Sequence, residues 1–373
     1  MVERSKNIPE PKTPKNKAQY NKLLKTGKAL YKKQDFVNAI KYFNRSFDFN
    51  NKNPNVLVLL SDSLFQIGNK TAAMQMMMHA LIKNPNDHNI ANILGNAAMK
   101  MEFYDLAQKF HQKHIELKPD DVMGYNNYAS ALREDGKLDE AVTFLKDILP
   151  IFPTADILWN TLAAIIAFRD GPGEAIVFYE ECLKINPKNT QALSNIAPAY
   201  ASIGKLNVAE KAVREAIKLA PNLRDAHLFL SSLLLNAQKL DEGWKQYQHR
   251  PGPKDIKPTI KHNKIPYWRG ENLKNKKILV FGEQGIGDEI LFSWLYSQLI
   301  DIAGEVTISC EQRLVELFKT SFPTARVGAT LSVIDKDIDN TIFITSDIET
   351  SDIDYQCLAG DLPMYFWKNY GEV

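Results

Sequence analysis

The chain repeats itself with a period of 34 residues, and this period constrains the fold more than any other feature. Each period is long enough for two amphipathic helices, with a small residue where the helices cross and a proline that ends the second helix. Such a unit cannot bury its apolar face alone, so neighbouring units must stack into a solenoid. The small residues are Ala39, Ala73, Ala107, Ala141, Ala175, Ala209 and Gly243, and the prolines are Pro85, Pro119, Pro153, Pro187 and Pro221.

This pattern resembles the tetratricopeptide repeat over residues 18–250, in about seven repeats. The resemblance implies a concave groove that binds a protein or peptide, with the fifth residue of each first helix facing it. Asparagines gather at and beside this register, and an amide can both donate to and accept from an extended peptide backbone. The alternative is compositional, because the whole chain is rich in asparagine. The predicted peptide-binding residues are Asn92, Asn96, Asn126, Asn127, Asn160 and Asn195.

Two features inside the repeats have a functional and a structural interpretation. His111 and His114 have a spacing that can bind metal, but they occupy packing registers and lack an evident third ligand, so core histidines are favoured. The methionine-rich run at residues 74–80 is interpreted as packing and solvent-facing residues rather than a cofactor site. We therefore expect no metal and no cofactor.

The ends of the repeat region and the bulk composition set further limits. Residues 1–17 are predicted to be a basic disordered tail, and residues 251–275 a proline-rich linker. A net charge of +2 over 373 residues gives no case for a nucleic-acid partner, and no stretch is long enough to span a bilayer. Three scattered cysteines indicate neither a disulfide framework nor a zinc site, so a cytoplasmic location is expected.

From residue 276 onward the pattern changes from paired helices to strands that alternate with helices. Strands are expected at 276–282, 305–310 and 341–345, and helices at 287–301 and 311–322, which predicts a mostly parallel sheet. The segment KILVFGEQGIGDEI at 277–290 is a strand, a glycine turn and a helix start. It matches neither the dinucleotide fingerprint nor the P-loop, and its two acids would repel a bound phosphate.

Three segments of this region together resemble proteins that join tetratricopeptide repeats to a heptosyltransferase-like (GT-B) glycosyltransferase domain. The segments are GEQGIGDEILF, EVTISCEQRLVELF and DYQCLAGDLP. The resemblance implies an all-α solenoid followed by an α/β Rossmann-like half-domain at 276–373. It implies that Asp288 is the catalytic base. A carboxylate at a helix N-terminus stays ionised at neutral pH and could accept a proton from a sugar hydroxyl. The expected acceptor-binding residues are Glu283, Gln284, Gly285, Gly287 and Glu289.

About a hundred residues leave room for only one half of such an enzyme, so a nucleotide-sugar donor is expected only through a missing or separate domain. Whether the chain is an enzyme therefore stays open. One hypothesis is a scaffold that recruits a polypeptide or glycan acceptor for sugar transfer. The other is a non-catalytic interaction scaffold in which the α/β part caps the solenoid.

Overall fold

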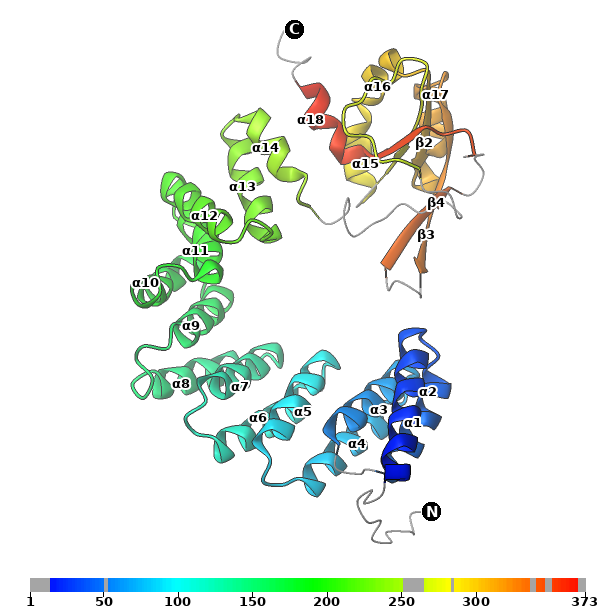
Figure 1. Ribbon diagram of the computed structural model, residues 1–373. Coiled ribbons are helices and arrows are strands. Elements are labelled where there is room, and N and C mark those ends of the chain that lie inside the picture. The colour runs from blue at the N-terminus through cyan, green and yellow to red at the C-terminus, as the bar shows by residue number, and fades with distance from the viewer. Residues whose placement is uncertain are drawn as a thin grey trace. The chain divides into compact units, whose positions relative to one another are not determined.

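A computed structural model describes residues 14–49, 53–250, 265–282, 285–335, 340–345 and 351–367. The chain divides into two compact units, Met1–Ala212 and Val213–Val373, and each is described by itself. Among the described residues, the first unit consists of helical hairpins that follow one another along the chain (Figure 1). The hairpins are α1 (Pro14–Lys32) with α2 (Phe36–Phe49), α3 (Pro54–Gln66) with α4 (Lys70–Lys83), α5 (His88–Lys100) with α6 (Tyr104–Leu117), α7 (Val122–Glu134) with α8 (Leu138–Ile148), α9 (Asp156–Arg169) with η1 (Pro172–Ala175) and α10 (Ile176–Ile185), and α11 (Thr190–Ser202) with α12 (Leu206–Leu219).

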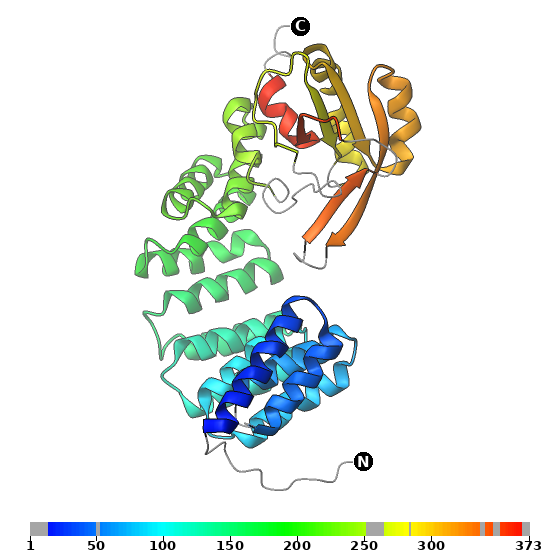
Figure 2. The same ribbon diagram turned by 45° about the vertical axis from the view of Figure 1, so that its right-hand side comes forward.

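The small residues of the 34-residue period lie where the sequence predicts them. Ala73, Ala107 and Ala141 have no exposed surface, which lets the second helix of each hairpin approach the first. Larger residues fill the space between successive hairpins; Leu94 and Phe110, both fully buried, belong to one such cluster. In the second view the helices of consecutive hairpins run side by side (Figure 2). The predicted solenoid of stacked hairpins is confirmed.

Polar side chains start several of the first helices. The Asp87 side chain accepts hydrogen bonds from the backbone N–H groups of Asn89 and Ile90, and that of Asp121 accepts one from Met123. These bonds satisfy N–H groups that have no partner within the helix. α1 begins at Pro14, so the helix includes the last residues of the segment that the sequence assigns to a basic tail.

The second unit contains a further hairpin, α13 (Arg224–Asn236) with α14 (Leu240–Tyr247), and a five-stranded sheet in the order β4-β3-β2-β1-β5. β1, β2, β3 and β5 are mutually parallel, whereas β4 pairs with β3 antiparallel. The mostly parallel sheet that the sequence predicts is confirmed. Its elements are β1 (Lys277–Phe281), α15 (Ile286–Ser293), α16 (Tyr296–Ile302), β2 (Glu305–Cys310), η2 (Gln312–Leu314), α17 (Val315–Ser321), β3 (Arg326–Asp335), β4 (Asn340–Thr345), β5 (Tyr355–Leu358), η3 (Ala359–Asp361) and α18 (Leu362–Phe366).

One face of this sheet holds the main core of the second unit. Ile278 and Val280 of β1 lie beside Val306 and Ile308 of β2 in the parallel register. Side chains from α15 to α18 cover them, among them Phe292, Tyr296, Phe318 and Phe366. The sequence predicts one helix over 287–301, but the structure has two. The first ends before Trp294 and the second begins after Leu295.

The hairpin α13–α14 packs on the α/β part within the same unit. The rings of Trp244 and Tyr247 lie 6.4 and 6.2 Å from that of Phe292. The predicted boundary between repeats and α/β domain at 251–275 stays a prediction, since residues 251–264 lie outside the described part. Within the described residues no helix is long and apolar enough to cross a membrane.

Candidate functional site

The six predicted asparagines form an amide row on four successive first helices, α5, α7, α9 and α11, and two hydrogen bonds from its members join neighbouring repeats. Asn127 donates from Nδ2 to Oδ1 of Asn92, 3.2 Å away, so α7 is joined to α5. The Thr161 hydroxyl donates to Oδ1 of Asn126 at 2.6 Å and joins α9 to α7. Both bonds span 35 residues, one more than the period. The structure therefore brings four predicted or adjacent groups together as links between repeats.

The other predicted asparagines differ in their surroundings. Asn96 is exposed, and Asn195 is half-buried. Oδ1 of Asn160 is buried and has no hydrogen-bond partner among the described residues. An amide has two donor hydrogens and an acceptor oxygen, so the amides in the inter-repeat bonds keep further hydrogen-bonding capacity.

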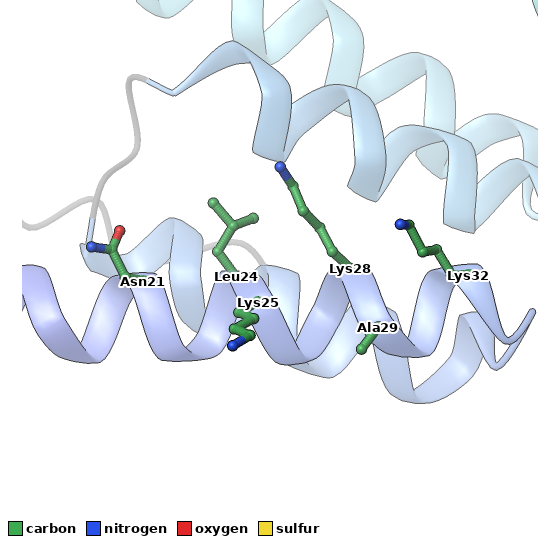
Figure 3. Close-up of a pocket in the computed structure, with 6 residues that line it drawn as sticks. All are labelled: Asn21, Leu24, Lys25, Lys28, Ala29 and Lys32. Atoms are coloured by element: carbon green, nitrogen blue, oxygen red, sulfur yellow. The ribbon is translucent and has the colours of Figure 1, made fainter.

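A shallow groove of about 410 Å³ lies along α1, and the sequence analysis did not identify it. Leu24, Lys28 and Lys32 project from one side of the helix (Figure 3). The signal in the sequence is charge, because α1 contains several lysines and no acidic residue. Its lining residues are Asn21, Leu24, Lys25, Lys28, Ala29 and Lys32.

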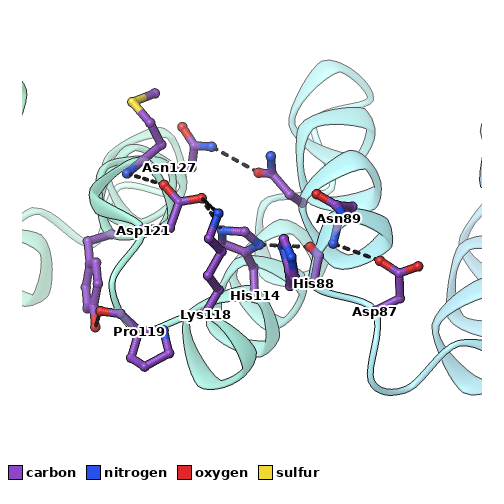
Figure 4. A network of polar contacts seen from close by, with 11 residues as sticks. Asp87, His88, Asn89, His114, Lys118, Pro119, Asp121 and Asn127 are labelled. Atoms are coloured by element: carbon purple, nitrogen blue, oxygen red, sulfur yellow. Dashed lines mark hydrogen bonds and ion pairs between the residues drawn. The ribbon is translucent and has the colours of Figure 1, made fainter.

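A polar network joins α5, α6 and the start of α7, next to the amide row (Figure 4). Nδ1 of His114 lies 2.8 Å from the carbonyl oxygen of His88, and Nε2 lies 3.1 Å from Oδ2 of Asp121. Burial alone would raise the pKa of Asp121, but hydrogen bonds from the Met123 N–H and from His114 outweigh it and lower the pKa. His114 is almost fully buried, so this network is part of the packing between repeats.

His111 is also buried, in agreement with its interpretation as a core histidine. Neither ring nitrogen has a hydrogen-bond partner among the described residues. Burial, together with the nearby His114, lowers the pKa of His111 to about 4. Among the described residues, no group of three or more His, Cys, Asp or Glu side chains could hold a metal ion.

The glycine loop after β1 is described from Gly285 onward, and the predicted acceptor residues Glu283 and Gln284 lie outside the described residues. Asp288 is half-buried, and its Oδ2 accepts a hydrogen bond from the Gly285 N–H at 3.3 Å, which places the carboxylate at the N-terminus of α15. Gly285 and Gly287 are exposed, and a side chain at Gly287 would meet open space. Asp288 therefore sits at the carboxyl edge of the parallel strands, where α/β sheets bind ligands.

Glu289 has a different environment from its neighbour Asp288. It is only 6% exposed, and its Oε2 accepts a hydrogen bond from the Glu311 N–H at the end of β2, 2.8 Å away. Burial raises the pKa of Glu289. A Cβ atom on Gly282 would lie 2.3 Å from the Glu289 carboxyl carbon, so the backbone at 282 can approach this carboxylate only because the residue is glycine. Glu289 thus ties the start of α15 to the end of β2.

A buried ion pair connects the end of α14 to the segment after β5. Arg250 donates to Oδ1 of Asp361 at 2.9 Å, and both side chains are at most 2% exposed. The Tyr267 hydroxyl and the Leu358 N–H donate to the other oxygen of Asp361. Burial, and then the charge of Asp361, raise the pKa of Tyr267. This contact brings together three segments that are far apart in the sequence. They are GWKQYQHR at 243–250, PYWRGENL at 266–273 and DYQCLAGDLP at 354–363.

The stacked helical hairpins are similar to tetratricopeptide repeats, and sequence models of that repeat match two parts of the chain. Models of the tetratricopeptide repeat match residues 94–156 and 190–223.

The chain is also similar to individual proteins over part of its length. The chain is 30% identical over 270 residues to the protein FlbA of Caulobacter vibrioides, covering 70% of this chain and 45% of that one. It is 26% identical over 187 residues to Hsp70-Hsp90 organizing protein 3 of Arabidopsis thaliana, covering 49% of this chain and 32% of the relative. The chain thus spans less than half the length of these curated relatives. Among solved structures, yeast Tom70 is 18% identical over 66% of this chain and 62% of its own, with a TM-score of 0.43.

Proposed function

We propose that the protein holds an extended polypeptide in the concave groove of its repeats, where the amides of α5, α7 and α9 bond the peptide backbone. The supporting observation is the pair of inter-repeat hydrogen bonds, Asn127 to Asn92 and Thr161 to Asn126. These bonds hold the amides of Asn92, Asn126 and Asn127 in place on α5 and α7 before any ligand arrives. A row whose side chains are already ordered loses less conformational entropy when a peptide binds.

Affinity capture followed by quantitative mass spectrometry tests this proposal. The informative variant is Asn96→Ala with Asn160→Ala, because neither side chain forms one of the inter-repeat bonds. A lost hydrogen bond contributes about 0.5–1.5 kcal/mol, so we expect the captured partner to bind roughly tenfold more weakly. Asn44→Ala, an exposed asparagine on α2, is the matched control and should capture the same amount as the wild type. Equal capture by all three proteins would contradict the proposal.

We further propose that the α/β unit provides the acceptor side of a glycosyl-transfer site, with Asp288 as the base. Its support is the position of a half-buried carboxylate at the N-terminus of α15, at the carboxyl edge of parallel strands. Asp288 would take the proton of an acceptor hydroxyl while that oxygen attacks the sugar carbon and the nucleoside diphosphate leaves. Gly285 and Gly287 would leave room for the acceptor, and a separate domain would bind the nucleotide-sugar donor.

Nucleotide-sugar hydrolysis and transfer, measured with a donor-binding domain supplied, test this second proposal. Asp288→Asn keeps the shape of the side chain, and removing a general base costs about 10²–10⁴-fold in rate. A loss of that size in transfer would support it. No transfer by the wild type, or an unchanged rate in Asp288→Asn, would leave the non-catalytic scaffold with an α/β cap as the function.

A further inference from the structure

The helix α4 has an exposed apolar stripe that no function described so far uses. Met74, Met78 and Ile82 follow one another at intervals of four residues and are 41%, 39% and 68% exposed. They lie on a different side of the helix from Ala73, Met77 and Ala80, which are fully buried. Over eight residues a helix rises about 12 Å, so the stripe is a ridge of about that length on the exposed side of α4.

The other repeats provide an internal comparison, because the 34-residue period aligns their second helices with α4. The register of Met78 carries a polar or charged residue in five other repeats, and the register of Ile82 carries a charged residue or proline in the same five. Only the second of these six repeats places two large apolar side chains there. The aligned residues are Asn44, Gln112, Lys146, Glu180 and Arg214 for Met78, and Asp48, Glu116, Pro150, Lys184 and Lys218 for Ile82.

The stripe borders a shallow groove of about 450 Å³. His79 forms one edge of this groove, and its ring meets that of Phe47 at 6.0 Å in an edge-on arrangement. Methionine side chains are flexible and polarisable, so a surface rich in them adapts to an apolar partner. The groove residues are Thr71, Met74, Gln75, Met78, His79 and Ile82.

Charge restricts what can cover this surface. Lys70 and Lys83 lie at the two ends of α4, and the helix contains no acidic residue. Two copies of α4 packed antiparallel would bring Lys70 of one copy near Lys83 of the other, and like charges at that distance repel. A partner with carboxylates beside its apolar residues would instead pair with both lysines.

We propose that the stripe of Met74, Met78 and Ile82 is a docking site for an amphipathic helix of another polypeptide, whose apolar edge is flanked by aspartate or glutamate. A helix fits because a straight ridge with a four-residue repeat meets the grooves of a second helix along its length. The stripe contains none of the asparagines of the amide row, so, together with the proposed peptide site, the scaffold would hold two polypeptides at separate surfaces.

The test uses the full chain and a fluorescein-labelled helical peptide of 20 residues, with leucine at every third or fourth position and glutamate beside each leucine. A second peptide has lysine in place of every glutamate. Fluorescence anisotropy should show saturable one-to-one binding of the acidic peptide and at least tenfold weaker binding of the basic one. Equal binding of the two peptides, or no binding of the acidic one, would overturn the proposal.

The decisive variant is Met78→Gln with Ile82→Glu, which places in α4 the two residues that the third repeat carries as Gln112 and Glu116. Both positions are exposed, so the variant should keep the helical circular dichroism of the wild type. We expect its affinity for the acidic peptide to fall at least tenfold. Val177→Gln, at an exposed apolar position of the fifth repeat, is the control and should bind as the wild type does.

Two further measurements decide whether another occupant covers the stripe. Phosphatidylcholine–phosphatidylserine vesicles should not bind the wild type more than the double variant, and wild-type binding that the variant loses would assign the stripe to a membrane surface. Sedimentation equilibrium should show the same mass for both proteins. A wild-type dimer that the double variant abolishes would assign the stripe to a second copy. Either result would overturn the proposal.

Discussion

His111 occupies a register that holds a large apolar or aromatic residue in the other repeats. Those residues are Phe43, Met77, Leu145, Tyr179, Val213 and Tyr247. The imidazole fits because residue 95, facing it on α5, is glycine, and a Cβ atom there would lie 2.4 Å from the ring. Both ring nitrogens lack a partner in the described part of the protein, so the folded state favours the neutral ring.

The low pKa of His111 predicts that the repeats lose stability in mild acid. The pKa is about 4 in the folded protein against 6.5 in the unfolded chain, so between these values only the unfolded chain takes up the proton. The free energy of unfolding should therefore fall as the pH drops from 6.5 to 4, by up to roughly 3 kcal/mol. His111→Leu should remove this dependence and stabilise the protein at pH 7 by about 1–3 kcal/mol. Urea unfolding at several pH values measures both effects, and a variant with the wild-type pH dependence would contradict the assignment.

The Arg250–Asp361 pair gives a second prediction at single residues. Asp361→Asn removes the carboxylate from a buried ion pair and keeps the Arg250 guanidinium, and breaking such a pair on one side typically costs about 3–5 kcal/mol. Replacing both residues, Arg250→Met with Asp361→Leu, removes both charges and should cost much less. Unfolding in urea, followed by tryptophan fluorescence, compares the two variants. Equal losses in the single and double variants would show that the ion pair is not the source of the effect.

For single residues, the sequence predicts on which face of a helix a side chain lies better than it predicts the hydrogen-bond partner of that side chain. The period places Asn92 and Asn126 on the same face, but the bonds to Asn127 and Thr161 use a 35-residue spacing that no register predicts. Asp288 and Glu289 are adjacent acids that the sequence cannot separate. Glu289 is buried because its carboxylate accepts a hydrogen bond from the Glu311 N–H at the end of β2, a contact that the sequence does not predict.

The turns within the hairpins form a second periodic feature, carried by backbone conformation. A residue with positive φ recurs at 34, 68, 102, 136, 204 and 238. Glycine supplies it at Gly68, Gly136 and Gly204, whereas Gln34, Glu102 and Gln238 adopt it with a side chain. Because these positions carry glycine in some repeats and a larger residue in others, residue types alone do not reveal this period. Left-handed backbone costs a non-glycine residue about 1–2 kcal/mol.

Exchanging residue types at these turns should change stability in opposite directions. Glu102→Gly removes the strain at φ 60° and should stabilise the protein by up to about 1 kcal/mol, because the greater freedom of glycine in the unfolded chain offsets part of the gain. Gly136→Ala introduces the strain at φ 77° and should destabilise by about 1–2 kcal/mol. Thermal unfolding of both variants measures the difference. A stabilising Gly136→Ala would contradict the turn assignment.

Among the elements of the α/β part, the predictable ones are those with a strong apolar pattern. KILVF and EVTISC are strands as predicted. β5 has only four residues, too few to give a clear period. In β3 the apolar residues Val327, Ala329, Leu331 and Val333 alternate with polar residues or glycine, so its sequence does indicate a strand, although none is predicted there. The break between α15 and α16 also follows from packing rather than propensity, since Leu295 and Tyr296 are fully buried against the sheet.

At the scale of the whole molecule, the 34-residue period predicts the solenoid, whereas the contacts of its last hairpin depend on the tertiary structure. The period runs on to Gly243, yet the second compact unit begins at Val213 and includes the hairpin α13–α14. Contacts between residues far apart in the sequence, such as those of Trp244 with Phe292 and Arg250 with Asp361, attach this hairpin to the α/β part. A local pattern carries no information about such distant partners.

The central proposal is that the repeats hold an extended polypeptide along the amide row. Site-specific photocrosslinking tests it most directly, with a benzophenone amino acid at position 96 on α5 and, as the matched position, at 44 on α2. Both native residues are exposed asparagines, so neither replacement disturbs the core. We expect position 96 to crosslink a discrete polypeptide that unlabelled wild-type protein competes away, and position 44 not to crosslink that polypeptide. The same polypeptide crosslinked equally from both positions, or from 44 alone, would contradict the claim.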